Sequence, residues 1–161
     1  MNIINFTEAH AAQAIFMLPV GAGGNRYSGL IRWAKKWDWG VGNVIARRLR
    51  RHRFSGWETV VVAMVNGEYA GFCALEKKDG YGTDLDVSPF VTAVYVDPKF
   101  RGRGLVGNVL DAACGFARSL GFDAVYLISS HQGLYEKYGF AQFTQTVVKT
   151  GKTEPVFRKT L

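Results

Sequence analysis

Hydrophobic residues follow a strand-like pattern over much of the chain after position 58. Two β-branched and apolar segments, Thr59–Val65 and Tyr69–Leu75, flank the dipeptide Asn66-Gly67. This dipeptide is a strong signal for a two-residue hairpin turn, so we expect the two segments to pair as antiparallel strands. Val91–Val96 and Ala124–Ile128 are apolar at nearly every position. Such segments predict interior strands that are covered on both faces.

The rest of this region contains helical and terminal strand patterns. Apolar residues recur at intervals of three and four over Val106–Leu120, which predicts a helix. A short helix is expected over Gly133–Tyr138, where Gly139 ends it. Two further strands, Ala141–Lys149 and Glu154–Thr160, are expected on either side of a polar turn.

The first third of the chain predicts one strand and three helices. Asn2–Phe6 suits a short strand, and Thr7 is placed to cap a helix over Glu8–Leu18. Apolar residues at helical spacing predict a second helix over Tyr27–Trp37. A third helix, over Val41–Leu49, has a narrow apolar stripe that is flanked by arginines.

The order of these elements is typical of a mixed α/β (α+β) protein, because strands and helices alternate along the chain. A length of 161 residues suits one domain. Hydrophobic residues make up 48% of the chain and charged residues 20%, which excludes disordered, collagen-like and coiled-coil proteins. We expect a single domain over residues 1–161, in which a helical, basic region over 1–57 precedes a sheet core over 58–161.

The cysteines and the apolar segments indicate the cellular compartment of the protein. Cys73 and Cys114 lie in apolar runs without the spacing of metal ligands, so we expect buried free thiols and no metal site. A single disulfide is the alternative. No stretch approaches the ~20 apolar residues of a membrane span, and the apolar segment 11–22 lacks the basic flank of a signal peptide. These patterns predict a cytoplasmic protein without a membrane partner.

The positive charge is concentrated toward the N-terminus. Residues 1–53 contain nine lysines and arginines against Glu8 and Asp38, which accounts for the whole net charge of +7. With the aromatic residues of the same region, this charge suits a nucleic-acid-binding module without enzymatic activity. The alternative, which we favour, is a pair of solvated helical faces whose tryptophans pack inward.

A glycine-rich turn links the strand at Val91–Val96 to the helix that follows it. Such a turn presents unpaired backbone N–H groups at the positive end of a helix dipole, where anions bind. Gly102-x-Gly104-x-x-Gly107 matches the fingerprint of dinucleotide-binding domains. However, five residues separate the strand from the first glycine, and no acidic residue ends the next strand. An ordinary structural turn and a coenzyme A site are the two other interpretations.

The coenzyme A interpretation rests on a family resemblance. The segment Val96-Asp97-Pro98-x-x-Arg101-Gly102-x-Gly104 resembles the signature of the GNAT superfamily of N-acetyltransferases, Arg/Gln-x-x-Gly-x-Gly/Ala. The resemblance implies that the amides of the turn hold the pyrophosphate of acetyl-CoA and that the preceding strand lies along its pantetheine arm. The implied cofactor-binding residues are Val94, Tyr95, Val96, Arg101, Gly102, Arg103, Gly104, Leu105, Val106 and Gly107. Val106 departs from the family pattern, because its branched side chain stands where glycine or alanine is usual.

A second motif follows about thirty residues later. The segment from Leu134-Tyr135 to Gly139-Phe140 is similar to another signature of this superfamily, an aromatic or aliphatic residue followed by Tyr-x-x-x-Gly-Phe. Two motifs in this order imply a GNAT-like fold, which is a mixed, mostly antiparallel sheet that is splayed at its centre and flanked by helices. They also imply transfer of an acetyl group from acetyl-CoA directly to a primary amine, within a ternary complex.

Such a transfer requires two proton movements, because the amine must lose a proton and the departing thiolate gains one. The resemblance assigns Tyr135 as the proton donor to the thiolate. The alternative is a structural tyrosine whose ring packs on the sheet and whose hydroxyl binds water.

The base that deprotonates the amine is not evident from the sequence. His131 is a candidate for catalysis or ligand contact, because neutral imidazole accepts protons near pH 7. A helix N-cap region over Ser129–His131 explains the same residues. Four acidic residues lie near the expected acceptor site, with a solvated acidic loop as the alternative: Glu76, Asp79, Asp84 and Asp86. We expect a small-molecule or peptide amine as acceptor and not nucleic acid. The oligomeric state is left open, with a homodimer as one option.

Overall fold

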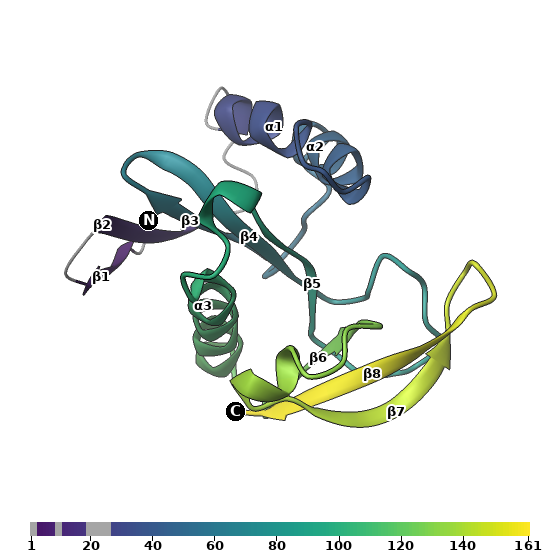
Figure 1. The fold of residues 1–161 in the computed structure, drawn as a ribbon. Helices are drawn as coiled ribbons and strands as arrows, with labels where there is room; N and C mark the ends of the chain where they lie inside the picture. The colour runs from purple at the N-terminus through teal and green to yellow at the C-terminus, as the bar shows by residue number, and fades with distance from the viewer. Residues whose placement is uncertain (1–2, 9–10, 19–26) are drawn as a thin grey trace.

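The structure is a computed structural model that describes residues 3–8, 11–18 and 27–161, with side chains from residue 27 onward. The described part forms one sheet, with helices on either side of it (Figure 1). The strands are β1 (Ile3–Glu8), β2 (Ala11–Leu18), β3 (Thr59–Val65), β4 (Glu68–Glu76), β5 (Phe90–Val96), β6 (Ala124–Ile128), β7 (Ala141–Val147) and β8 (Thr153–Thr160). The helices are α1 (Ser28–Ala34), α2 (Val41–Arg50), α3 (Leu105–Ser119) and the short 3-10 helices η2 (Pro98–Phe100) and η3 (Tyr135–Tyr138).

The eight strands follow the spatial order β1-β2-β3-β4-β5-β6-β8-β7. Neighbouring strands are antiparallel except β5 and β6, which are parallel and pair only at Phe90 and Tyr126. Beyond this pair the two strands separate, so β5 has an unpaired edge toward its C-terminal end (Figure 1). This arrangement confirms the expected mixed, mostly antiparallel sheet that is splayed at its centre.

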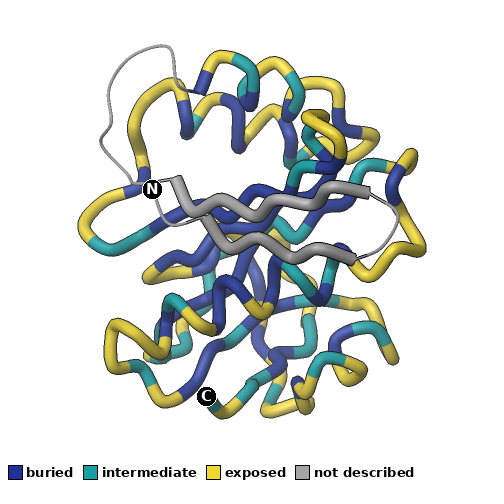
Figure 2. Tube along the Cα trace, turned by 90° about the vertical axis from the view of Figure 1, so that its left-hand side faces the viewer, coloured by how far each residue is buried: buried dark blue, intermediate teal, exposed yellow. Residues whose placement is uncertain are grey.

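Side chains of the central strands alternate between two hydrophobic cores. Val60 and Val62 pack with α1 and α2 on one face of the sheet. Val61 and Ala63 pack with α3 on the other face. The buried positions of the helices accordingly point toward the sheet, whereas their exposed positions point outward (Figure 2). Helices therefore cover both faces, as the resemblance implied.

Local turn chemistry explains why many boundaries lie where the sequence predicts them. Asn66 and Gly67 both have positive φ, 49° and 79°, as a two-residue hairpin of the favoured twist requires. The helix α3 ends before Gly121 and η3 ends at Gly139, where φ is 87° and 85°. Glycine adopts this left-handed backbone without a steric cost. The predicted strand hairpin and both glycine-terminated helices are confirmed.

The predicted helix over Glu8–Leu18 is wrong, because this segment contains the strand β2. From Gln13 opposite Val65 to Leu18 opposite Val60, β2 pairs with the edge of β3, and β1 pairs with β2 on its other side. The backbone N–H and C=O groups at the edge of β3 thereby gain partners, and this long-range pairing outweighs a local preference for helix. The strand expected over Asn2–Phe6 is confirmed by β1. The helices expected over Tyr27–Trp37 and Val41–Leu49 are confirmed by α1 and α2.

Both cysteines are buried and free, as predicted. The Cys73 thiol donates a hydrogen bond to the carbonyl oxygen of Val109 at 3.4 Å, and burial raises the pKa of this thiol. Within the described ranges, no helix combines the length and the hydropathy that a membrane span needs. No cluster of three or more metal-ligating side chains occurs in that same part of the chain.

Candidate functional site

The glycine-rich turn between β5 and α3 presents backbone N–H groups at the start of a helix. Gly102 and Gly104 have φ of 77° and 74°, and Gly104 is the N-cap of α3. The first backbone hydrogen bond of the helix runs from the N–H of Asn108 to the carbonyl of Gly104, at 3.3 Å. The N–H groups of residues 105–107 precede this bond, so they have no partner within the helix. They lie at the positive end of a 15-residue helix, which is an anion-binding geometry.

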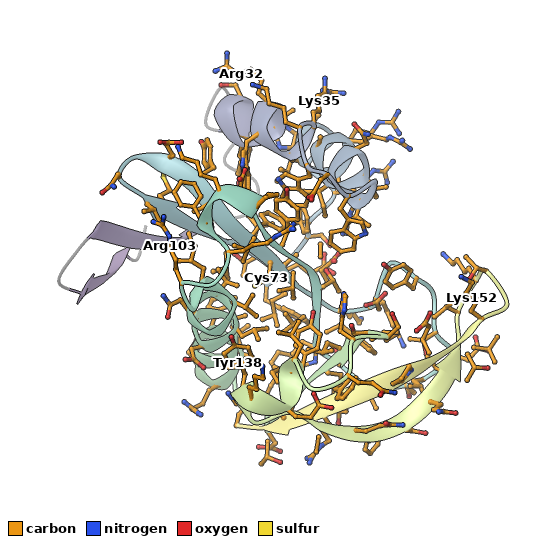
Figure 3. The ribbon with its side chains drawn as sticks, viewed as in Figure 1. Arg32, Lys35, Cys73, Arg103, Tyr138 and Lys152 are labelled. Atoms are coloured by element: carbon orange, nitrogen blue, oxygen red, sulfur yellow. The ribbon has the colours of Figure 1, made fainter. Side chains whose placement is uncertain are left out.

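The two arginines of the turn have different surroundings. The Arg101 Nε donates to the carbonyl of Val96 at 3.0 Å, and its Nη2 lies 3.2 Å from both carboxylate oxygens of Asp38. Arg103 is exposed, and its guanidinium lies 5.5 Å from the centre of the Phe100 ring (Figure 3). Among the described residues, Arg103 has no carboxylate partner. Arg103 is therefore free to bind an anion, whereas Arg101 is already held by protein groups.

A bulge interrupts the middle of β5. Phe72 pairs with Tyr95 and Ala74 pairs with Thr92, so two residues of β5 stand opposite one residue of β4. Ala93 adopts a φ of 50°, which is uncommon for alanine. A bulge leaves its extra residue outside the hydrogen-bond ladder. The sequence contains no signal for it, because Ala93 lies in a mostly apolar run and is not a glycine.

The predicted pantetheine-binding residues divide between the two faces of the sheet. Val94 is half-buried and, with Val96, packs against the core beneath α3. Tyr95 is buried in the opposite core, where its ring stacks on Trp37 with centroids 4.2 Å apart. Val94 and Val96 thus lie on the face of α3, close to where β5 and β6 separate.

Tyr135 is buried in the core beneath α3, between the rings of Phe140 and Phe157. Burial raises the pKa of Tyr135 to about 12, and a side-chain hydrogen bond with Ser129 opposes the shift in part. Its pKa is also raised by Cys73, the residue opposite the bulge of β5. The phenol is therefore protonated at neutral pH, and it lies within electrostatic reach of the residue that faces the bulge.

The segment that precedes Tyr135 forms a hydrogen-bonded turn. The backbone N–H of His131 donates to the Ser129 hydroxyl at 3.1 Å, and Ser129 also bonds with Tyr135. The side chain of His131 is exposed. No sequence pattern distinguishes Ser129 as a site residue, because serine is common in turns and carries no distinctive spacing.

The four acidic residues at the end of β4 and in the loop that follows do not form a uniform solvated loop. Asp84 and Asp86 are exposed, but Glu76 and Asp79 are buried. Glu76 accepts hydrogen bonds from Arg48 of α2 and from the hydroxyl of Thr92. The solvated-loop interpretation is thus wrong for Glu76 and Asp79 and correct for the other two.

The buried carboxyl group of Asp79 lies near the carboxyl group of Glu76. The Oδ1 of Asp79 accepts a hydrogen bond from the N–H of Tyr81 at 2.7 Å. Burial is the main reason that its pKa rises to about 6, and the nearby Glu76 raises it further. The Tyr81 N–H and the charge of Arg48 act in the opposite direction. Asp79 therefore titrates closer to neutrality than an ordinary carboxyl does.

The basic residues of α1 and α2 lie mainly on the outer surface. Arg32 and Lys35 point away from the sheet (Figure 3). The exposed cations of the described part of this region are Arg32, Lys35, Lys36, Arg47, Arg50, Arg51 and Arg53. Trp37 is buried against the sheet and Trp33 is partly buried there, as the favoured interpretation expects. Trp39 is 36% exposed, so the expectation of an inward tryptophan is wrong at that position. Arg26 lies outside the described residues.

The fold excludes the dinucleotide-binding interpretation of the glycine turn. That interpretation needs the turn to belong to a βαβ unit of a parallel sheet. Here β5 is antiparallel to β4, and it meets the parallel strand β6 at a single residue pair.

Comparisons with known proteins agree on one family. Residues 56–142 match the family model of the acetyltransferase (GNAT) domain, which is more than half of the chain. No curated protein matches the sequence. A proposed streptothricin acetyltransferase from Bacillus anthracis, solved in complex with acetyl coenzyme A, is 15% identical with a TM-score of 0.55. That alignment covers 66% of this chain and 64% of the other, so this chain spans slightly less than two thirds of that protein.

Other solved structures align over nearly their whole length. A proposed GNAT-family acetyltransferase from Bordetella pertussis is 15% identical with a TM-score of 0.69, and 99% of each chain is covered. A GNAT-family acetyltransferase from Staphylococcus aureus is 17% identical with a TM-score of 0.62, covering 91% of this chain and 99% of that one. At these identities the structural likeness establishes the fold.

Proposed function

The chain belongs to the GNAT family of acetyltransferases, and we propose that it transfers an acetyl group from acetyl-CoA to a primary amine. The transfer would be direct, within a ternary complex and without a covalent enzyme intermediate. The observation that carries this proposal is the position of the free amides at the start of α3, beside the unpaired edge of β5. A pyrophosphate and an extended thioester arm would find complementary groups in one continuous site.

The amides of residues 102–107 are the proposed ligands of the pyrophosphate. Their N–H groups and the helix dipole favour negative charge, and each such dipole contact contributes about 0.3–1 kcal/mol. The free guanidinium of Arg103 would add a charge-assisted hydrogen bond. The arm that follows would run along Val94–Val96, where the edge of β5 that faces β6 is unpaired.

The proposed chemistry assigns a role to the bulge and to Tyr135. The amine nitrogen attacks the thioester carbonyl carbon, so negative charge develops on the carbonyl oxygen. An unpaired N–H at the bulge would stabilise this charge, as donors in oxyanion holes do. The C–S bond then breaks, and the Tyr135 hydroxyl would donate its proton to the departing thiolate. A phenol with a pKa of about 12 is protonated before the reaction and is a weaker acid than a thiol. Proton transfer from Tyr135 therefore has to occur while the C–S bond is breaking, before water solvates the thiolate.

His131 is the proposed base for the amine, directly or through water. Its exposed side chain can reach bulk water, which suits a group that must pass a proton to solvent. The pH profile of kcat/KM tests this role. If His131 is the base, the rising limb near neutral pH disappears in His131→Ala. An unchanged limb would remove His131 from the mechanism.

Binding of acetyl-CoA is the first test of the proposed function. At about a hundred times its dissociation constant, a ligand adds ~2.7 kcal/mol to the free energy of unfolding. For a domain of this size, that corresponds to a rise in Tm of roughly 5–10 °C. NADH and a short DNA duplex serve as control ligands. A rise with acetyl-CoA alone, followed by thiol release in the presence of amines, is the expected result. No rise at millimolar acetyl-CoA, with a salt-sensitive rise from DNA, would contradict the proposal and favour a nucleic-acid-binding module.

A further inference from the structure

The segment between α1 and α2 contacts the glycine-rich turn through Asp38. Its Oδ1 accepts a hydrogen bond from the Tyr95 hydroxyl at 2.9 Å. Both carboxylate oxygens lie 3.2 Å from Nη2 of Arg101. Asp38 therefore joins the α1–α2 layer to the end of β5 and to the residue that directly precedes Gly102.

A second contact joins the same two regions at Asp97, four residues before Arg101. The indole Nε1 of Trp33 donates to Oδ2 of Asp97 at 3.1 Å. The other oxygen of Asp97 accepts from the N–H of Lys99 at 3.0 Å and so caps η2. The segment from Asp97 to Arg101 is thus held to the α1–α2 layer at both of its ends.

Two further contacts hold the groups that meet at Asp38, whose side chain, like that of Arg101, is about half exposed. The Nε of Arg101 bonds to the carbonyl of Val96, so the guanidinium bridges the end of β5 and Asp38. Tyr95 is stacked on the buried Trp37, which fixes the direction of its hydroxyl toward Asp38. The hydrogen bond from Tyr95 and the positive charge of Arg101 lower the pKa of Asp38. Asp38 is therefore ionised across the neutral range.

The glycine turn needs such external support. Gly102 and Gly104 have no side chains to restrain them, and both adopt a left-handed backbone. Glycine has more accessible backbone conformations than other residues, so a free turn would lose more entropy when it binds a ligand. Ordering the turn in advance reduces the cost of binding.

We propose that Asp38 is a positioning residue for the cofactor: it holds Arg101 and Tyr95, and thereby keeps the amides of residues 102–107 in the geometry that binds a pyrophosphate. This inference rests on the proposed function for the identity of the ligand. It also makes the α1–α2 layer part of the cofactor site, although no residue of that layer belongs to the glycine turn.

The test compares two donors, of which only one carries the pyrophosphate together with its 3′-phosphoadenosine group. Acetyl-CoA contains it, whereas S-acetylpantetheine has the same thioester and the same arm without it. Asp38→Asn keeps the size of the side chain and removes the charge. We expect KM for acetyl-CoA to rise about tenfold in this variant, as loss of one charged hydrogen bond would produce. Its kcat with acetyl-CoA, and its kcat/KM with S-acetylpantetheine, should remain within about twofold of the wild type.

Asp86→Asn is the matched control, because it removes the same charge from an exposed site, where the ion pair found among the described residues is with Lys78 at 3.7 Å. It should leave both donors unaffected. Tyr95→Phe removes one hydrogen bond to Asp38 and leaves the Arg101 contact, so a smaller rise in KM for acetyl-CoA is expected. This second variant keeps the inference testable if Asp38→Asn does not fold.

Two results would overturn the inference. An equal loss of activity with both donors would assign Asp38 a general structural role, and unchanged kinetics with acetyl-CoA would assign it none. Direct titration with coenzyme A separates this inference from the proposed function. If the wild type binds coenzyme A but acetylates no amine, the proposed function fails, and a weaker Kd in Asp38→Asn still supports the positioning role. If the wild type does not bind coenzyme A, both proposals fail.

Discussion

The ring of Tyr138 lies directly against Gly107, in the first turn of α3. A Cβ atom at position 107 would fall 2.7 Å from Cε1 of Tyr138 and 3.2 Å from its Cδ1. The second motif of the chain thus packs on the first one through a residue pair that only a glycine permits. The contact also gives a structural reason for glycine at 107, one position after Val106.

Gly107→Ala is expected to destabilise the fold. The new methyl group overlaps the Tyr138 ring, and overpacking of this kind typically costs about 1–3 kcal/mol. Gly115→Ala in the same helix is the control, because nothing lies within 4 Å of the added Cβ. That control should gain about 0.5–1 kcal/mol from helix propensity. Urea unfolding measures the free energy of unfolding of both variants. In a protein that already carries Tyr138→Ala, Gly107→Ala should cost less stability than it does in the wild type. Equal behaviour of the two alanine variants would contradict the contact.

Arg48→Ala is expected to destabilise the protein by roughly 3 kcal/mol, because it leaves the Glu76 carboxylate buried without its cation. The Glu76 side chain is only 3% exposed. Arg47→Ala is the matched control: Arg47 is exposed, and it has no ion pair among the described residues. Its removal should change the free energy of unfolding by less than about 0.5 kcal/mol. If Arg48→Ala and Arg47→Ala lower the free energy of unfolding equally, the buried ion pair of Arg48 with Glu76 does not anchor α2 to the sheet.

Asp79 should make stability depend on pH. Its pKa is about 6 in the folded protein, against an ordinary value of 3.8, so the folded state binds the proton more tightly. The stability that it contributes is complete below about pH 4 and is lost as the pH rises through 6. Asp79→Asn should remove this decline and be more stable than the wild type at pH 8, by up to ~3 kcal/mol. Thermal unfolding across this range measures the effect, and the exposed Asp86→Asn should follow the wild-type curve.

Tyr135→Phe should lower kcat by about a hundredfold with little change in Tm, because it removes a proton donor and keeps the buried ring. The pKa of Tyr135, about 12, implies that the donor remains protonated up to at least pH 11. The wild-type kcat should therefore show no alkaline decline from this group below that pH. Tyr126→Phe, on the neighbouring strand β6, is the control and should retain kcat. Full activity of Tyr135→Phe would assign Tyr135 a structural role.

Several parts of the fold and the site follow from short sequence segments. Asn66-Gly67 predicts the β3–β4 hairpin because its two positive φ values suit that turn. The spacing of apolar residues predicts α3, and the glycines at 102 and 104 predict the N–H groups at its start. In each case the physical cause lies within a few residues, namely a turn conformation, a helical period or an unpaired helix end.

Other features depend on partners that are distant in the sequence. β2 is a strand because β3 offers it an edge about fifty residues later, and Arg101 is held by Asp38, 63 positions away. Burial of Glu76 and Asp79 likewise depends on how α2 and the following loop close over the sheet, and the bulge at Ala93 depends on pairing with β4. The sequence by itself determined the hairpin, the helix α3 and the glycine-rich turn that precedes this helix. Only the tertiary structure decided which side chains support that turn, because no local pattern encodes a contact between segments that meet only after folding.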